Sequence, residues 1–363
     1  MDVYRSCWMD DELEMFGDAA RRFVQNEIVP NDARWREQKL IDRDLWNKAG
    51  EVGLLCTDIP DEYGGVGGDA RHEAVVALEM GRHGISSFGH VVHSILAHYV
   101  LNYGTEQQKQ SWLPRMATGE LVGAIAMTEP GAGSDLQGIK MRADRDGDDY
   151  VLNGSKTFIS NGYHAGLVGV VARTDPSLGS KGISIIMCET RDLPGYRVGQ
   201  LLDKIGQNGW DTAELFFDDV RVPVGCLLGP EEGQGFVQLM RDLPYERALL
   251  ALGGVGAMEY ALDLTTDYTR SRKLFGQSLL DMQNTRFKLA EVKTLTQIAR
   301  VFADDCVQKL ALGELDTVTA SMAKLWITDT QTRVMDECLQ LFGGYGYSKE
   351  YPISQLYVDA RVQ

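Results

Sequence analysis

The segment Ala126-Met-Thr-Glu-Pro-Gly-Ala-Gly-Ser-Asp135 lies near the middle of this 363-residue chain and is its most informative stretch. Its proline and two glycines predict a tight turn that carries few side chains. Such a turn brings backbone N–H groups and hydroxyls close to a ligand, and phosphate oxygens suit that geometry. A plain surface turn fits the same residues. A second segment, Lys156-Thr-Phe-Ile-Ser-Asn-Gly162, favours the ligand-binding interpretation. It lies downstream on a predicted strand and hairpin.

The pattern of apolar residues divides the chain into a helical part over 1–121, a β part over 122–228 and a second helical part over 229–363. In the first part, apolar residues recur every three or four positions from Leu13, and Ile28-Val29-Pro30 is expected to end the first helix. In the middle part, short apolar runs alternate with turn residues such as Asn153-Gly154, which predicts an antiparallel barrel or sandwich.

The third part contains three long amphipathic stretches, which predict helices. Long helices with short joints bury their apolar stripes by forming a bundle. The predicted fold class is therefore α+β, with an N-terminal helical domain, a central β-domain and a C-terminal helical bundle. The three predicted bundle helices cover residues 236–272, 282–312 and 316–343.

Composition excludes several function classes. The net charge of −16 disfavours nucleic acid and anionic membranes, which both attract clustered Lys and Arg. No apolar run reaches the roughly 18 residues of a membrane span. His93 and His98 approach one helical face without a carboxylate pair nearby, so no metal site is predicted.

The compartment follows from weaker signals. Six scattered cysteines without a Cys-x-x-Cys pair indicate a reducing environment. The first ten residues have neither an apolar signal core nor the character of a transit peptide. We expect a cytoplasmic protein, or one of the mitochondrial matrix if the chain is a processed eukaryotic protein.

Further stretches, one before and three after the two central segments, add to the pattern. The chain, over essentially its whole length, resembles the acyl-CoA dehydrogenase flavoprotein family, and within it the long-chain and isovaleryl branch. The stretches that carry the resemblance are Pro60-Asp-Glu-Tyr-Gly-Gly-Val-Gly-Gly-Asp69, Ser271-Arg-Lys-Leu-Phe-Gly-Gln277, Gln283 and Gln340-Leu-Phe-Gly-Gly-Tyr-Gly346.

The resemblance implies a helical domain, a β-domain and a four-helix bundle, usually assembled as a homotetramer and at least as a homodimer. It implies FAD as the cofactor, held between the β-domain and the bundle with residues from a neighbouring subunit. The positions that match FAD-binding positions are Met127, Thr128, Phe158, Ser160, Arg272, Phe275, Gln283, Gln340, Gly343 and Gly344. Ser134 and Arg247 match positions on the substrate side, and His90, Val91, Ser94 and Ile95 match the floor of the acyl pocket.

The resemblance places the catalytic base in one of two positions. In most members it is a glutamate in a turn after an Asp-Ala-Arg segment, and this chain stops at Asp359-Ala-Arg-Val-Gln363, short of that turn. In the long-chain and isovaleryl branch it lies on the first bundle helix. There Leu243-Pro-Tyr-Glu-Arg-Ala-Leu249 matches, and Glu246 is the expected base. An acidic residue that stabilises a helix start is the alternative role for Glu246.

The implied reaction is the α,β-dehydrogenation of an acyl-CoA to the trans-2-enoyl-CoA, as in fatty acid β-oxidation. Glu246 would take the α-proton, flavin N5 the β-hydride, and an electron-transfer flavoprotein the electrons. A dehydrogenase of carrier-protein-bound acyl groups is one alternative. A flavin oxidase or monooxygenase on the same scaffold is another, in which O2 would reoxidise the flavin quickly.

Overall fold

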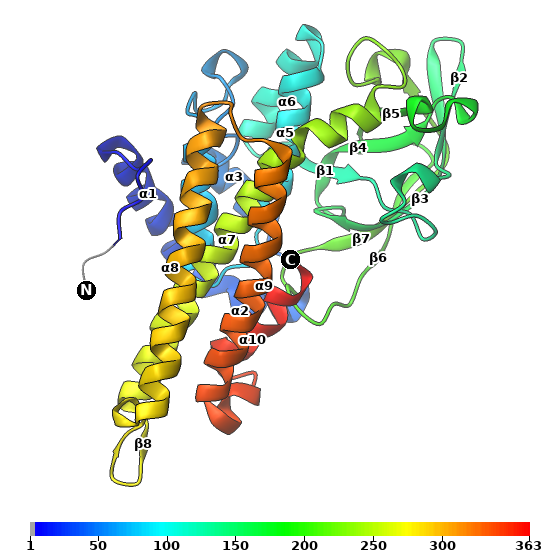
Figure 1. Cartoon of the computed structure of the whole chain (residues 1–363). Coiled ribbons are helices and arrows are strands. Elements are labelled where there is room, and N and C mark those ends of the chain that lie inside the picture. The colour runs from blue at the N-terminus through cyan, green and yellow to red at the C-terminus, as the bar shows by residue number, and fades with distance from the viewer. Residues whose placement is uncertain (1–3) are drawn as a thin grey trace.

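The structure is a computed structural model that describes residues 4–363, so residues 1–3 of the predicted first domain lie outside the described part. The first domain is helical, as predicted (Figure 1). Asp10 caps the first helix by accepting a hydrogen bond from the Leu13 N–H. The helices are α1 (Asp11–Phe23), α2 (Val29–Gln38), α3 (Asp44–Glu51), α4 (Ala70–Arg82), α5 (His90–Tyr103) and α6 (Glu106–Ala117).

The expectation that Ile28-Val29-Pro30 ends the first helix is wrong. The chain passes from α1 through one π-helical turn, Val24–Ile28, directly into α2, and Pro30 occupies the first turn of α2. Pro30 has no N–H to donate to the preceding turn, and the π-turn before it accommodates that missing hydrogen bond. The local change at Ile28-Val29-Pro30 is therefore a π-helical turn within a continuing helix and not a helix end.

The middle domain is one curled sheet of seven strands in the order β1-β4-β2-β3-β7-β6, with β5 paired to β4. The predicted three-part architecture is confirmed, but the sheet is mixed, because β1 pairs with β4 in parallel. Parallel pairing follows from the long connection between these strands, which carries the β2–β3 hairpin. The strands are β1 (Val122–Ala126), β2 (Arg142–Asp146), β3 (Asp149–Ser160), β4 (Ala165–Arg173), β5 (Ile183–Glu189), β6 (Tyr196–Leu201) and β7 (Thr212–Pro223).

Asn153-Gly154 does not form the predicted turn. Both residues lie inside β3, which pairs along its length with β7 through two register shifts. Gly154 has a φ of +146°, and a Cβ on it would lie 2.7 Å from Met141 Sδ. The glycine therefore accommodates a bulge and close packing rather than a chain reversal.

The C-terminal domain is a helical bundle, and its three long helices lie where the sequence predicted them. The short hairpin of β8 (Lys273–Leu274) and β9 (Gln277–Ser278) projects from one end (Figure 1). The helices are α7 (Gly235–Ser271), α8 (Gln283–Ala311), α9 (Thr317–Leu341) and α10 (Pro352–Asp359).

Helix α7 is the centre of the molecule. It is long and apolar enough to cross a membrane by length and composition alone, but 61% of its most apolar 18-residue window is buried inside the protein. It packs against α4, α5, α8 and α9, so its apolar surface is the core of the molecule.

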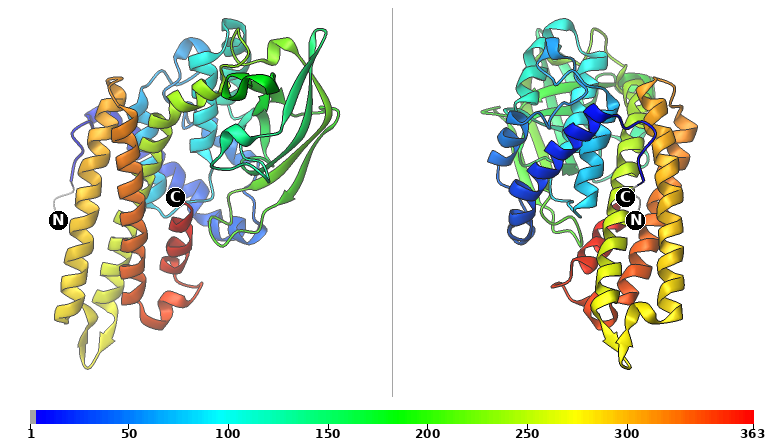
Figure 2. Two further views of the ribbon diagram at one scale, coloured as in Figure 1. Left: turned by 45° about the vertical axis from the view of Figure 1, so that its right-hand side comes forward. Right: turned by 90° about the vertical axis from the view of Figure 1, so that its left-hand side faces the viewer.

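The three domains meet beside the chain's C-terminal end, where Figure 2 shows the bundle, the first helices and the sheet converging. The buried carboxylate of Asp359 accepts hydrogen bonds from Arg36 Nη1 at 2.9 Å and Ser86 Oγ at 2.6 Å in the first domain. It also accepts one from the backbone N–H of Gln207, which precedes β7. One carboxylate thus holds all three domains together.

Candidate active site

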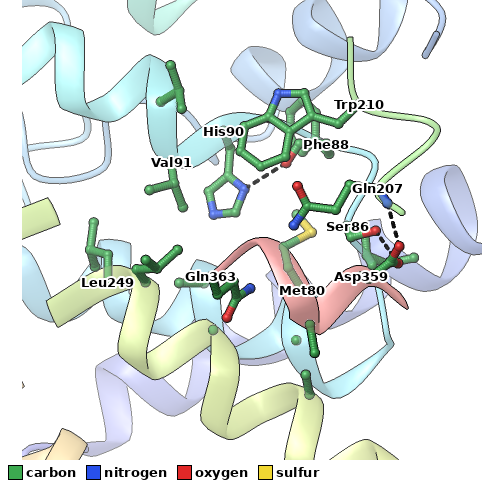
Figure 3. A pocket seen from close by; sticks show the side chains of 18 of the residues that line it. Met80, Ser86, Phe88, His90, Val91, Gln207, Trp210, Leu249, Asp359 and Gln363 are labelled. Atoms are coloured by element: carbon green, nitrogen blue, oxygen red, sulfur yellow. Dashed lines mark hydrogen bonds between the residues drawn. The ribbon is translucent and has the colours of Figure 1, made fainter. Parts of the chain in front are cut away.

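A mainly apolar cavity of about 390 Å³ lies between α4, α5, α7 and the C-terminal segment (Figure 3). Its apolar walls include Met80, Phe88, Val91 and Leu249, and Trp210 closes one side. A cavity with few polar groups binds an apolar chain and orients it by those few groups.

Glu246 lies on the α7 wall of this cavity. Burial raises the pKa of Glu246 to about 7, and the negative charge of Asp242 adds to that effect. A hydrogen bond from Tyr99 Oη to Glu246 Oε1 at 3.0 Å and the positive charge of Arg247 act in the opposite direction. A carboxylate whose pKa lies near neutrality is a stronger base than an ordinary one and is still ionised at physiological pH.

The alternative role predicted for Glu246 was that of an acid that stabilises a helix start. Glu246 lies eleven residues inside α7, which begins at Gly235, so the helix-start role is wrong. Pro244, two residues earlier, lies inside the same helix and does not begin it.

Arg247 follows Glu246 and also lines the cavity. Its Nη1 donates a hydrogen bond to Ser321 Oγ on α9 at 2.9 Å, which fixes the guanidinium at the cavity wall. Lys324, one turn further along α9, lines the same cavity. Arg247 and Lys324 are thus two cations in the cavity wall, and cations there can bind an anionic part of a ligand.

Three of the four residues expected at the pocket floor do line the cavity: His90, Val91 and Ile95. Ser94 does not line the cavity, and its side chain is buried. Burial lowers the pKa of His90 to about 4, so its ring is neutral. Its Nδ1 faces the Phe88 carbonyl oxygen at 3.3 Å (Figure 3).

The two central sequence segments lie side by side. The Thr157 N–H donates to the Thr128 carbonyl at 2.9 Å, and Lys156 Nζ donates to the Met127 carbonyl at 2.9 Å. The tight turn forms as predicted, because Glu129 and Ala132 exchange two backbone hydrogen bonds across it. Met127 and Thr128 are consequently half-buried at the surface that also carries Phe158 and Ser160.

A buried ion pair that sequence reasoning missed supports this turn. Lys156 Nζ lies 2.9 Å from Glu129 Oε1, and the Glu129 carboxylate also accepts hydrogen bonds from the N–H groups of Lys140 and Met141. Burial lowers the pKa of Lys156 to about 8, against the effect of Glu129. Lys156 lies in a strand that also contains Asp, Asn, Ser and Thr, so its sequence context did not indicate that the lysine is buried.

Phe158 is the exposed aromatic residue of this surface. It leaves 66% of its side chain exposed and has a φ of +59°, which is rare for a bulky residue. The register shift between Lys156 and Ile159 produces this geometry. An exposed ring held by a strained backbone is typical of a ligand contact.

The position of Ser134 differs from that of the cavity residues. It lies exposed on the far side of the tight turn and does not line the cavity. Side chains added at Gly131 or Gly133 would meet no atom within 4 Å, so this turn is open above its backbone.

The remaining predicted cofactor residues gather at the far end of the bundle. Arg272, Gln340, Gly343 and Gly344 line a second cavity of about 870 Å³. Within residues 4–363, Arg272 makes no ion pair, and its guanidinium lies 5.7 Å from the centre of the Tyr345 ring.

Phe275 and Gln283 lie exposed beside this second cavity, at the hairpin tip and at the start of α8. Phe275 is 96% exposed and has a φ of +51°, so it resembles Phe158 in both respects. One copy of the chain does not bring the bundle-end residues to Phe158, because the hairpin and the sheet lie at opposite ends of the molecule (Figure 1).

These two surfaces fit a flavin dinucleotide divided between them. Each offers an exposed, strained phenylalanine that suits a flat ring, and the bundle end adds an unpaired arginine and the open backbone of Gly343 and Gly344. Metal binding has no comparable support, because residues 4–363 hold no group of three or more potential metal ligands.

The chain matches three domain families in succession. Residues 10–120 match the acyl-CoA dehydrogenase N-terminal domain, residues 124–220 the middle domain and residues 233–363 the C-terminal domain. The chain is 45% identical to the mitochondrial long-chain specific acyl-CoA dehydrogenase of Sus scrofa over 97% of this chain and 82% of the relative.

Solved structures agree in fold. An acyl-CoA dehydrogenase from Geobacillus kaustophilus superposes with a TM-score of 0.96 at 43% identity, covering 99% of this chain and 94% of the other. A glutaryl-CoA dehydrogenase from Mycobacterium smegmatis in complex with FADH2 gives 0.90 at 29% identity, covering 98% and 90%. Prolyl acyl carrier protein oxidase AnaB gives 0.91 at 30% identity, covering 98% and 94%.

Proposed function

Because this chain belongs to the acyl-CoA dehydrogenase family of FAD-dependent oxidoreductases, we propose that it dehydrogenates an acyl-CoA thioester with Glu246 as the base. The observation that carries this proposal is the position of Glu246. It is a carboxylate with a pKa near 7 in the wall of an apolar cavity large enough for an acyl chain.

In the proposed reaction, one Glu246 oxygen accepts the proton from the acyl α-carbon, and the carboxyl becomes neutral. Bound FAD supplies the acceptor for the β-hydrogen and its electron pair. The C–H electron pair left at the α-carbon forms the new double bond, which gives the trans-2-enoyl thioester. The apolar walls exclude water, which keeps the base poorly solvated and reactive.

The acyl chain occupies the cavity of about 390 Å³, and Arg247 and Lys324 face the anionic part of the ligand. The direct test is an anaerobic titration of the purified yellow protein with acyl-CoAs of graded length and branching. Bleaching of the flavin absorbance supports the proposal and ranks the substrates. No bleaching with any CoA ester contradicts it.

The flavin lies between two copies of the chain in this proposal. Met127, Thr128, Phe158 and Ser160 of one copy contact the ring system, and a second copy supplies the other contacts. Those bundle-end contacts are Arg272, Phe275, Gln283, Gln340, Gly343 and Gly344.

Removing the Arg272 guanidinium tests this placement. We expect Arg272→Ala to weaken FAD binding by about 10-fold or more, because a charged hydrogen bond to a phosphate is lost. Flavin absorbance retained after gel filtration, and titration of apoprotein with FAD, measure the change. Arg270→Ala is the matched control, since Arg270 lies two residues earlier and pairs with Asp267 at 2.8 Å. Equal FAD affinity in the two variants would contradict the placement.

A shared cofactor needs an oligomer, and the outer face of α8 and α9 supports one. It carries several exposed large apolar side chains, and such side chains gathered on one face are typical of a protein–protein interface. This apolar stripe comprises Phe287, Ile298, Val301, Val318, Met322, Leu325 and Trp326. We propose a homotetramer in which this stripe is buried.

A charge placed in that stripe should break the assembly. We expect Leu325→Asp to shift the protein to smaller species at micromolar concentration, because burying an unpaired carboxylate costs several kcal/mol, roughly. Sedimentation velocity measures the shift. Leu178→Asp makes the same exchange at an exposed leucine of the middle domain and should leave the assembly intact. A tetramer unchanged by Leu325→Asp would exclude this face as the interface.

For reoxidation we propose an electron-transfer flavoprotein as the acceptor. A flavin oxidase is the competing function, because a prolyl acyl carrier protein oxidase has the same fold. Substrate-reduced protein that stays reduced in air for minutes, and is reoxidised by electron-transfer flavoprotein, supports the dehydrogenase. Rapid reoxidation by air alone supports the oxidase.

A further inference from the structure

Helix α5, which forms part of the cavity wall, also holds the base from outside the cavity. Tyr99 on α5 donates its phenolic O–H to Glu246 Oε1 at 3.0 Å, across 147 residues of sequence. The Tyr99 side chain is fully buried in the main core, and it does not line the cavity. The phenol therefore reaches the carboxylate from the protein side and does not touch a ligand in the cavity.

The same face of α5 is fixed to the same stretch of α7 by further contacts. The His98 ring stacks on Tyr245 with ring centres 3.8 Å apart. One turn later, Asn102 Nδ2 donates to Asp242 Oδ1 at 3.1 Å. Tyr99 is thus placed by contacts on both sides of it and has little freedom to leave Glu246.

The second oxygen of Glu246 differs from the first. Within residues 4–363, Oε2 accepts no hydrogen bond, whereas Oε1 is held by Tyr99. We propose that Tyr99 is the positioning residue of the base, which fixes Oε1 from behind the cavity wall and leaves Oε2 to meet the acyl chain. This inference rests on the proposed function of Glu246.

The hydrogen bond also favours the charged form of the base. A donor to a carboxylate stabilises the anion, so loss of the Tyr99 hydroxyl should raise the pKa of Glu246. Other groups around Glu246 stay in place in such a variant. They are Asp242 and Arg247 on α7, Lys324 on α9, Asp359 on α10 and the neutral His90 on α5.

The test compares Tyr99→Phe with wild-type protein. The rate of flavin reduction by an acyl-CoA should rise with pH as Glu246 loses its proton. In Tyr99→Phe that rise should move to higher pH by about 1–2 units, the size expected when a hydrogen bond to a charged group is lost. Reduction at pH 6 then falls about 10-fold or more, and much of the rate returns at pH 9.

A second measurement needs neither substrate nor flavin reduction. The infrared band of a protonated carboxyl that is absent in Glu246→Gln reports the ionisation of Glu246 directly. Its midpoint in Tyr99→Phe should lie above that of wild type by the same 1–2 units, roughly. Tyr150→Phe is the matched control, because Tyr150 is also a buried tyrosine whose Oη donates to a carboxylate, Glu232 Oε1 at 2.5 Å, and it lies in the middle domain outside the cavity.

These measurements distinguish failure of the Tyr99 role from failure of the proposed function. Equal infrared midpoints in wild type and Tyr99→Phe would overturn the positioning role, even if the variant were less stable. A shift of the same size in Tyr150→Phe would also overturn it. A shifted midpoint in a protein whose flavin no acyl-CoA reduces would support the Tyr99–Glu246 contact and overturn the proposed function.

Discussion

Glu246→Gln should retain FAD and lose flavin reduction by acyl-CoA by a factor of at least about 100, and up to about 10,000. Glutamine keeps the shape of the side chain but cannot accept the α-proton. The loss should appear in the rate of the first half-reaction, measured by anaerobic stopped-flow absorbance. FAD binding should be unchanged, because Glu246 lines the acyl cavity and is not among the residues proposed to hold the flavin.

The same variant should be more stable than wild type above pH 7. The pKa of Glu246 is raised in the folded protein from 4.5 to about 7, so the folded state binds more protons than the unfolded state between these values. Stability of the wild type therefore falls as pH rises through that window. Glu246→Gln removes this loss, and we expect a gain of about 1–3 kcal/mol at pH 8 by urea unfolding.

Asp267→Asn, an exposed acid on the same helix, is the matched control and should change neither rate nor stability appreciably. If Glu246→Gln were reduced at the wild-type rate, Glu246 would not be the base and another residue would have to accept the α-proton. A stability gain without loss of reduction would show that Glu246 is a buried carboxylate with no part in catalysis.

Lys156→Ala should destabilise the protein by about 3–5 kcal/mol. The lysine is 1% exposed, and its removal leaves the Glu129 carboxylate buried with only its two backbone donors. The Met127 carbonyl loses its hydrogen bond from Lys156 as well. These groups hold the Glu129–Ala132 turn, which lies next to the strand that carries Phe158. We therefore also expect weaker FAD binding.

Two control variants test whether the unpaired buried charge causes the loss of stability. Lys140→Ala removes a nearby exposed lysine and should cost less than about 0.5 kcal/mol. Lys156→Met with Glu129→Gln removes both charges at once, and it should recover part of the stability because no buried charge is left unpaired. A Lys156→Ala variant as stable as wild type in urea would show that water replaces the ammonium without cost.

Helices were the most predictable part of the fold. The bundle helices begin and end within two residues of the stretches that their apolar periodicity indicated. Pro30 and Asn153-Gly154 show where local rules failed. A π-turn carries the chain into Pro30, and pairing with β7 keeps Asn153 and Gly154 extended, so tertiary contacts outweighed the local preference in both places.

The candidate site was predictable to the extent that its residues lie in motifs. Glu246, Arg247 and the pocket residue His90 do line one cavity. The predicted flavin residues form two separate surfaces, whose joining in an oligomer remains a proposal. Tyr99 carries no motif, and its partner is 147 positions away, so no periodicity or spacing could have indicated it.

The sequence alone determined the three-part order of helices and strands, the family and the identity of the candidate base. These follow from local periodicity and from residues close together in the chain. Only the tertiary structure decided the parallel pairing of β1 with β4, the Lys156–Glu129 pair and the contact of Tyr99 with Glu246. Each of these depends on how distant segments of the chain pack. Burial at such contacts shifts the pKa of a carboxyl or an ammonium group, and residue type alone does not predict that shift.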